Sequence, residues 1–138
     1  MSFVLDASVG CAWVFADETT DALDALLEQA GDEVVYVPAV WRLEVTNALV
    51  LAARRGRIPS DDVAAYWEQL ERLAIERVAW APPITRTVEL CKKHELTAYD
   101  AEYLALAVWL RLPLATVDER LAVAARAEGV TVLGGLTS

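Results

Sequence analysis

The chain of 138 residues is long enough for one domain with a substantial buried core, and we expect a single domain over residues 1–138. Its net charge of −9 repels polyphosphates. This excludes an ordinary nucleic-acid binder with a basic face, but not an enzyme whose acidic site holds divalent cations. Hydrophobic residues make up 56% of the chain, more than a small domain is expected to bury, so we expect a homo-oligomer or another protein partner.

Cysteine usage and apolar runs predict a cytoplasmic protein without a membrane segment. Cys11 and Cys91 lie far apart without a CxxC spacing, which is typical of buried apolar residues in a reducing compartment. The opening MSFVLDAS has no basic stretch and reaches Asp6 early, unlike a signal peptide. The longest apolar run, Leu104 to Leu110, is too short to span a bilayer.

In the first half of the chain, short apolar runs alternate with amphipathic stretches. Thr19 or Thr20 is a suitable helix cap, and Pro38 suits the first turn of a long helix. The β-branched run after Gly31 favours a strand. The expected elements are a strand Ser2–Leu5, a helix through Trp13, a helix from Thr20 to about Gly31, a strand Val34–Val37, a helix from Pro38 to Gly56, and a helix from Ser60 to about Glu76.

The second half continues the alternation. Pro82-Pro83 ends a possible strand, and Thr97 is a suitable helix cap. The expected elements are a strand Arg77–Trp80, a helix Ile84–His94, a helix from Thr97 to about Leu110, a strand Leu114–Val117, a helix from Asp118 to Gly129, and a strand Val130–Leu133. Strands separated by helices predict an α/β domain whose central parallel sheet is flanked by helices on both faces, with ligands at the carboxyl ends of the strands.

Four acidic residues are the candidate site. Asp6 ends the first strand and Asp118 ends the strand LATV, so both belong to the edge where α/β domains bind ligands. Asp100 falls in the first turn of its helix, and Glu44 lies among apolar residues about two turns into another helix. Gathered carboxylates repel one another unless cations neutralise them, and their hard oxygens suit Mg²⁺ or Mn²⁺. Such ions activate water for attack on a phosphodiester, which requires no protein nucleophile.

Each acid also has a structural alternative. Asp6 and Asp118 are both placed to cap the helices that follow them. Asp100 completes a T-x-x-D pattern with Thr97, which is typical of a capping box. Glu44 has the weakest alternative, because an unpaired acid near a buried face is costly. Three acids at strand ends or first turns, together with one semi-buried glutamate, favour a site.

Four segments, in order, resemble the PIN-domain nucleases, specifically the VapC-type toxins of type II toxin–antitoxin systems. The segments are FVLDAS, WRLEVTNAL, LTAYDAEYLALA and LATVDERL, and the resemblance covers essentially the whole chain. It implies a PIN-like fold and an Mg²⁺ site, with Mn²⁺ as a substitute, made by the acids Asp6, Glu44, Asp100 and Asp118. It places Ser8 and Thr116 beside these acids, and it implies endonucleolytic cleavage of RNA, a homodimer and inhibition by a cognate antitoxin.

Other polar residues are secondary candidates. Asn47 shares a helix face with Glu44 and is placed to orient a carboxylate, although an ordinary polar helix position is the alternative. His94 lies in a KKHE context that predicts a solvated surface. Arg54, Arg55 and Arg57 at a helix end complement the helix dipole, with a phosphate-contacting patch as the alternative. The acidic surface favours an antitoxin with a basic segment.

Two other function classes compete with the nuclease. A phosphatase with Asp6 as nucleophile usually carries a second aspartate two residues on, where this chain has Ser8. A non-catalytic acidic interaction module, with the carboxylates serving as helix caps, is the other alternative, and the apolar surplus is compatible with it. The tryptophans at helical apolar positions are expected to lie mainly in the core, with one or two at a partner surface. They are Trp13, Trp41, Trp67 and Trp109.

Overall fold

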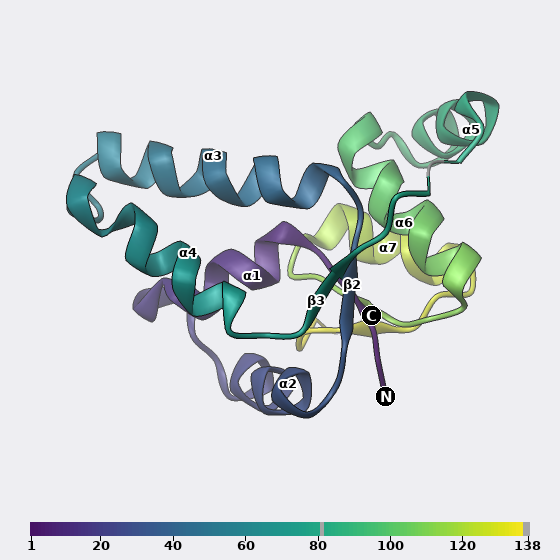
Figure 1. Cartoon of the computed structure of the whole chain (residues 1–138). Helices are drawn as coiled ribbons and strands as arrows, with labels where there is room; N and C mark the ends of the chain where they lie inside the picture. The colour runs from purple at the N-terminus through teal and green to yellow at the C-terminus, as the bar shows by residue number, and fades with distance from the viewer. Residues whose placement is uncertain (81, 137–138) are drawn as a thin grey trace.

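Five parallel strands form the central sheet in the computed structural model, which describes residues 1–80 and 82–136 (Figure 1). The strands are β1 Val4–Leu5, β2 Val35–Val37, β3 Ile75–Arg77, β4 Leu114–Ala115 and β5 Val132–Leu133. The α-helices are α1 Ala7–Val14, α2 Asp21–Asp32, α3 Val40–Arg54, α4 Val63–Glu71, α5 Ile84–His94, α6 Ala98–Leu110 and α7 Glu119–Ala127, with short 3-10 helices at Ala16–Glu18 and Ser60–Asp62. The predicted α/β class is confirmed. The predicted domain also included residues 81, 137 and 138, which lie outside the described residues.

The strand order places the candidate site at a reversal in the sheet. In the order β3-β2-β1-β4-β5, the chain proceeds from β1 toward β3 on one side and from β4 to β5 on the other. Right-handed crossovers then place α1 to α4 on one face and α5 to α7 on the other, as Figure 1 shows. Such a reversal leaves a crevice at the carboxyl ends of the neighbouring strands. Asp6 follows β1 and Thr116 follows β4, so both lie at this crevice.

The strands are short, but the residues in and around β1 are deeply buried. Phe3, Val4 and Leu5 are fully buried, as expected for a parallel strand covered on both faces. Helix α6 contacts both β1 and β4 and is buried nearly all round through its middle, from Leu104 to Ala107. None of the described helices combines the length and apolar character needed to cross a membrane.

The third strand begins two residues earlier than predicted. We expected a helix to about Glu76 and a strand Arg77–Trp80, but α4 ends at Glu71 and β3 is Ile75–Arg77. This strand lies at the edge of the sheet, paired with β2 alone, and its residues are partly or fully exposed. Because an edge strand buries little, its apolar pattern is weak, and the more apolar residues 78–80 that follow it were misleading.

Three of the four tryptophans assigned to the core are there. Trp41 is buried and packs against the partly buried Trp67 with ring centroids 5.4 Å apart, and Trp13 donates to the Leu23 carbonyl oxygen at 2.9 Å. Trp109, by contrast, lies outside the core, because its side chain is 53% exposed. It stacks on Trp80 with centroids 4.5 Å apart and an interplanar angle of 5°.

His94 is not the solvated residue that its polar neighbours predicted. Its side chain is 10% exposed, and its Nε2 lies 2.8 Å from Glu128 Oε2. The same oxygen accepts from Lys93 Nζ at 2.8 Å, and Arg86 lies 3.4 Å from the other oxygen. Since Arg86, Lys93 and His94 belong to α5 and Glu128 follows α7, this cluster joins two helices on one face of the sheet. A contact so distant in sequence leaves no local signal.

We expect Glu128→Gln to lower the free energy of unfolding by about 1–2 kcal/mol at neutral pH, allowing for the exposed lysine partner. Hydrogen bonds from Lys93 and His94 lower the pKa of Glu128 to about 2. A depressed carboxyl pKa stabilises the fold above the ordinary value near 4.5, and this contribution is lost as the pH falls toward 2. Urea unfolding of both proteins should therefore show a gap at pH 7 that narrows below about pH 4.5.

Glu89→Gln is the matched control, because Glu89 contacts the same Arg86 but is 68% exposed. It should change the stability by less than about 0.5 kcal/mol. Equal losses in the two variants, or a gap for Glu128→Gln that does not depend on pH, would contradict the role given to the cluster.

Candidate active site

Asp6 is buried at the carboxyl end of β1 and is held by two hydroxyl groups. Its side chain is 4% exposed, and its Oδ2 accepts hydrogen bonds from Ser8 Oγ at 2.6 Å and Thr116 Oγ1 at 2.8 Å. Although Asp6 precedes α1, its side chain makes no capping hydrogen bond to that helix. The alternative in which Asp6 is only a helix cap is therefore wrong. Its carboxylate is instead directed toward the end of β4.

The two hydroxyl groups are themselves fixed by the backbone after β4. Ser8 Oγ accepts from the Val117 N–H at 3.1 Å, and Thr116 Oγ1 accepts from the Asp118 N–H at 3.0 Å. Because each hydroxyl accepts from a backbone N–H, its own proton is available for Asp6. Ser8 and Thr116 thus lie beside Asp6, whereas Asn47 is exposed on α3 and its side chain forms no hydrogen bond with the described residues.

Glu44 projects from α3 into the same region with an unsatisfied oxygen. Its Oε1 is buried and has no hydrogen-bond partner among the described residues. The hydroxyl of the fully buried Tyr103 also forms no regular hydrogen bond with the described residues, but it lies close enough to the Glu44 carboxylate to lower its pKa. Tyr103 was not singled out from the sequence, because an aromatic residue inside an apolar helix ordinarily indicates core.

The remaining two acids, Asp100 and Asp118, lie at the starts of helices. Asp118 Oδ1 accepts from the Leu121 N–H at 3.0 Å, so this residue caps α7, as the structural alternative held. Thr97 caps α6 by accepting from the Asp100 N–H at 3.2 Å, which leaves the Asp100 side chain in the first turn, half-buried. Burial raises the pKa of Asp100, and the charge of the nearby Asp118 carboxylate adds to the rise.

Burial, with a smaller contribution from mutual repulsion, raises the pKa values of the Asp6 and Glu44 carboxyl groups. Burial raises the pKa of Asp6 to about 6, against the hydrogen bonds from Ser8 and Thr116, and the charges of Asp100 and Glu44 add to the rise. Burial also raises the pKa of Glu44, the Tyr103 hydroxyl opposes that rise, and the charge of Asp100 adds to it. A cation placed among these groups would relieve both the repulsion and the desolvation.

The acids are compatible with a hard cation such as Mg²⁺, although their side chains do not surround a single point. Among residues 1–80 and 82–136, no three carboxylate, histidine or cysteine side chains lie close enough together to hold one metal ion. Two observations on the described residues nonetheless suit Mg²⁺. Glu44 presents a buried oxygen without a partner there, and the candidate metal ligands of the cluster are all oxygen atoms. The residues present therefore suit a divalent cation that completes its coordination with water.

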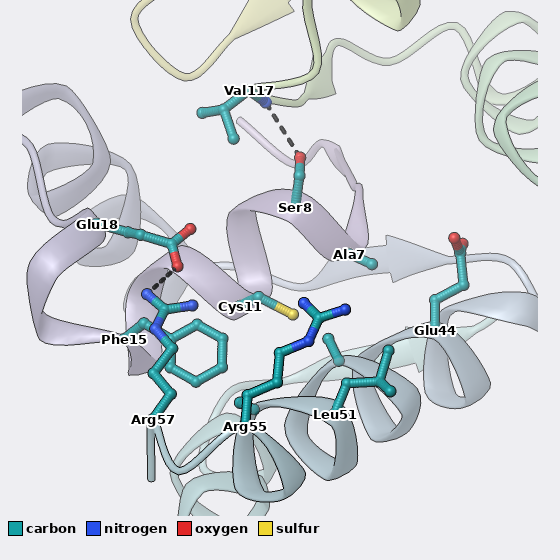
Figure 2. A pocket seen from close by; sticks show the side chains of 12 residues that line it. Ala7, Ser8, Cys11, Phe15, Glu18, Glu44, Leu51, Arg55, Arg57 and Val117 are labelled. Atoms are coloured by element: carbon teal, nitrogen blue, oxygen red, sulfur yellow. Dashed lines mark hydrogen bonds and ion pairs between the residues drawn. The ribbon is translucent and has the colours of Figure 1, made fainter.

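A groove of about 450 Å³ leads away from the acids between α1 and α3. Figure 2 shows Ser8 and Glu44 at one end and two arginines at the other, with Cys11 between them. The Arg57 guanidinium lies 2.6 Å from both Asp17 and Glu18 and 4.1 Å from the centroid of the Phe15 ring. Burial raises the pKa of the Cys11 thiol to about 12, so this cysteine is not a nucleophile at neutral pH.

Sequence comparisons match almost the entire chain. Residues 3–127 match the family model of the PIN domain. The chain is 31% identical over 124 residues to Ribonuclease VapC3 of Pyrobaculum aerophilum, covering 88% of this chain and 93% of that protein. It is 33% identical over 119 residues to Ribonuclease VapC12 of Mycobacterium tuberculosis, covering 86% and 88% respectively.

Solved structures share the fold at lower sequence identity. PAE2754 from Pyrobaculum aerophilum superposes with a TM-score of 0.73 at 21% identity, covering 96% of this chain and 89% of that chain. FitAcB from Neisseria gonorrhoeae gives a TM-score of 0.68 at 20% identity, covering 97% of each chain. These similarities extend across the sheet and the helices that carry the four acids.

Proposed function

We propose, from the premise that this chain belongs to the PIN-domain family, that it is an Mg²⁺-dependent endoribonuclease and the toxin of a toxin–antitoxin pair. The family match covers residues 3–127, and the relatives at 31% and 33% identity are ribonucleases. The observation that carries the proposal is the buried Asp6, which is held by two hydroxyl groups and surrounded by other acids instead of capping its helix.

Each acid has a distinct part in this proposal. Asp6 and Glu44 would hold the cation directly, because Asp6 is the most buried of the four acids and Glu44 presents a buried oxygen with no partner among the described residues. Asp100 and Asp118 would add their negative charges to the cation site, binding the ion either directly or through water. A bound Mg²⁺ would activate a water for attack on the phosphodiester and offset the charge on the leaving oxygen. The expected products carry a 5′-phosphate and a 3′-hydroxyl. Ser8 and Thr116 keep Asp6 in position.

The test is cleavage of a total bacterial RNA pool by purified protein free of antitoxin, with Mg²⁺, with Mn²⁺ and with EDTA. We expect discrete cuts with either metal and none with EDTA, because chelation removes the cation that neutralises the four acids. Primer extension would map the cuts, and end-group analysis would check for the 5′-phosphate. Cutting that continues in EDTA would refute the metal-dependent mechanism.

Calorimetry separates the nuclease from the acidic interaction module. The caps formed by Asp118 and Thr97 are the observations that favour the module. Isolated caps should not bind Mn²⁺ with an affinity that depends on Asp6 and Glu44, whereas a metal site should. Absence of both Mn²⁺ binding and RNA cleavage would favour the module.

The proposal extends to partners and location. The net charge of −9 and the acidic cluster suit an antitoxin with a basic segment. Exposed apolar side chains, including Leu43, Ile84 and Trp109, are compatible with a homodimer, which light scattering would detect. A toxin that cuts cellular RNA would act in the cytoplasm. Antitoxin binding that survives neutralisation of its basic segment would count against this account of the partner.

A further inference from the structure

One stripe of α3 connects the acidic cluster to the basic end of the groove. Glu44, Ala48, Leu51 and Arg55 all line the groove, and they are spaced at i, i+4, i+7 and i+11 along the helix. Residues at this spacing share a helix face, and eleven residues of helix span about 16 Å. The stripe therefore leads from the proposed cleavage site to Arg55 along a continuous surface.

The three arginines near the end of α3 have different surroundings. Arg57 is neutralised by Asp17 and Glu18 and covers the Phe15 ring. Arg54 is exposed and does not line the groove. Arg55 is exposed and lines the groove, where Figure 2 shows its side chain extending between α1 and α3. Its guanidinium forms no ion pair with the described residues.

An arginine that has no ion-pair partner in the described part of the chain, and that faces a groove in a strongly acidic protein, is suited to bind an anion. Its planar guanidinium matches the paired oxygens of a phosphate. The other end of the groove is the cluster where a phosphodiester would be cut. A polyanionic strand lying in the groove would therefore meet one free positive charge at a distance from the reacting bond.

We propose that Arg55 binds a backbone phosphate of the RNA strand next to the cleaved bond, and so positions a single-stranded segment along the α1–α3 groove. The inference rests on the proposed ribonuclease function and adds to it a substrate-positioning residue. Because the contact is to a phosphate, it contributes affinity and register without selecting a base. Arg55 does not reach the reacting atoms in this proposal, so its loss affects substrate binding more than the chemical step.

The test compares Arg55→Gln with Arg54→Gln, which removes the same charge from the same helix end. Arg55→Gln should raise KM for a single-stranded RNA about tenfold while kcat stays within about twofold. Arg54→Gln should leave both within about twofold, because Arg54 lies outside the groove. Arg55→Lys should recover part of the loss. Thermal unfolding of all variants checks that the helix end is intact.

A binding measurement makes the test independent of cleavage. In an Asp6→Asn background, fluorescence anisotropy with the same labelled RNA should show about tenfold weaker binding for Arg55→Gln. The slope of log K against log salt should fall in magnitude by about 0.7, as expected for one lost phosphate contact on a single strand. Equal effects at Arg54 and Arg55, or no effect at Arg55 while the parent protein cuts RNA, would overturn the inference alone. A parent protein that neither cuts nor binds RNA would overturn the proposed function as well.

Discussion

Asp6→Asn should reduce RNA cleavage about a thousandfold or more while leaving the protein folded. Asparagine preserves the shape of the side chain, and its single carbonyl oxygen can accept both hydrogen bonds now made to Asp6 Oδ2. What is lost is the charged oxygen that would bind a cation. The measurement is single-turnover cleavage of a defined RNA in Mg²⁺, beside circular dichroism of both proteins.

The same substitution should stabilise the metal-free protein at alkaline pH. Burial raises the pKa of Asp6 to about 6, so the folded state bears the cost of a buried charge above that pH. A carboxyl group with a raised pKa stabilises the fold most at pH values below its unfolded-state pKa, near 3.8. This stabilisation is lost as the pH rises through 6. In EDTA at about pH 8, the free energy of unfolding of Asp6→Asn should therefore exceed that of the parent by about 2 kcal/mol. This difference in stability should disappear as the pH falls toward about 4.

Metal and control variants separate this account from a folding defect. Mg²⁺ should raise the melting temperature of the parent and have a much smaller effect on Asp6→Asn, because a ligand that binds only the folded state stabilises it. Asp32→Asn makes the same charge change at an exposed position on α2 and should behave like the parent. An Asp6→Asn protein that keeps a tenth of the parent activity would contradict the assignment of Asp6 to the site.

Most of the fold follows from local patterns in the sequence. The run that ends at Leu5 and the β-branched run before Pro38 are strands, as predicted, because central parallel strands are buried on both faces and therefore read as continuous apolar runs. The edge strand β3 was misplaced because only Ile75 gives it an apolar signal. Helix α6 was predicted, but not the exposure of Trp109 near its end. Periodicity identifies an apolar face without showing where the neighbouring elements stop covering it.

The candidate site was predictable only in part. Asp6 and Thr116 follow neighbouring parallel strands, so the topology alone brings them to one edge of the sheet. The approach of Tyr103 on α6 to Glu44 on α3 brings together two residues that are far apart in the chain, and no spacing in the sequence encodes it. Likewise, the three arginines around Gly56 are equivalent in the sequence. The structure distinguishes them: Arg55 and Arg57 both line the groove, but Arg57 is already paired with Asp17 and Glu18.

Gly134→Ala should be the most destabilising substitution of a glycine, because this residue touches the backbone that supports the site. Gly134 has a φ of +126°, a conformation that residues with a side chain rarely adopt. A Cβ at this position would lie 2.6 Å from the carbonyl oxygen of Thr116. Since a Cβ is fixed directly to the backbone and the oxygen it would meet is itself a backbone atom, the clash cannot be relieved by turning a side chain. We expect a loss of about 3 kcal/mol or more, measured by urea unfolding.

Gly129→Ala is the matched control, because Gly129 also has a positive φ, of +78°, but a Cβ there would meet nothing within 4 Å. It should cost only the backbone strain, about 1 kcal/mol. The difference between the variants then measures the contact with Thr116, whose hydroxyl donates to Asp6. A displaced Thr116 should also lower the cleavage rate of Gly134→Ala under conditions where the protein remains folded, whereas Gly129→Ala should cut like the parent. Equal losses of stability in the two variants would show that the backbone after β5 moves to accommodate the Cβ at position 134 without displacing Thr116.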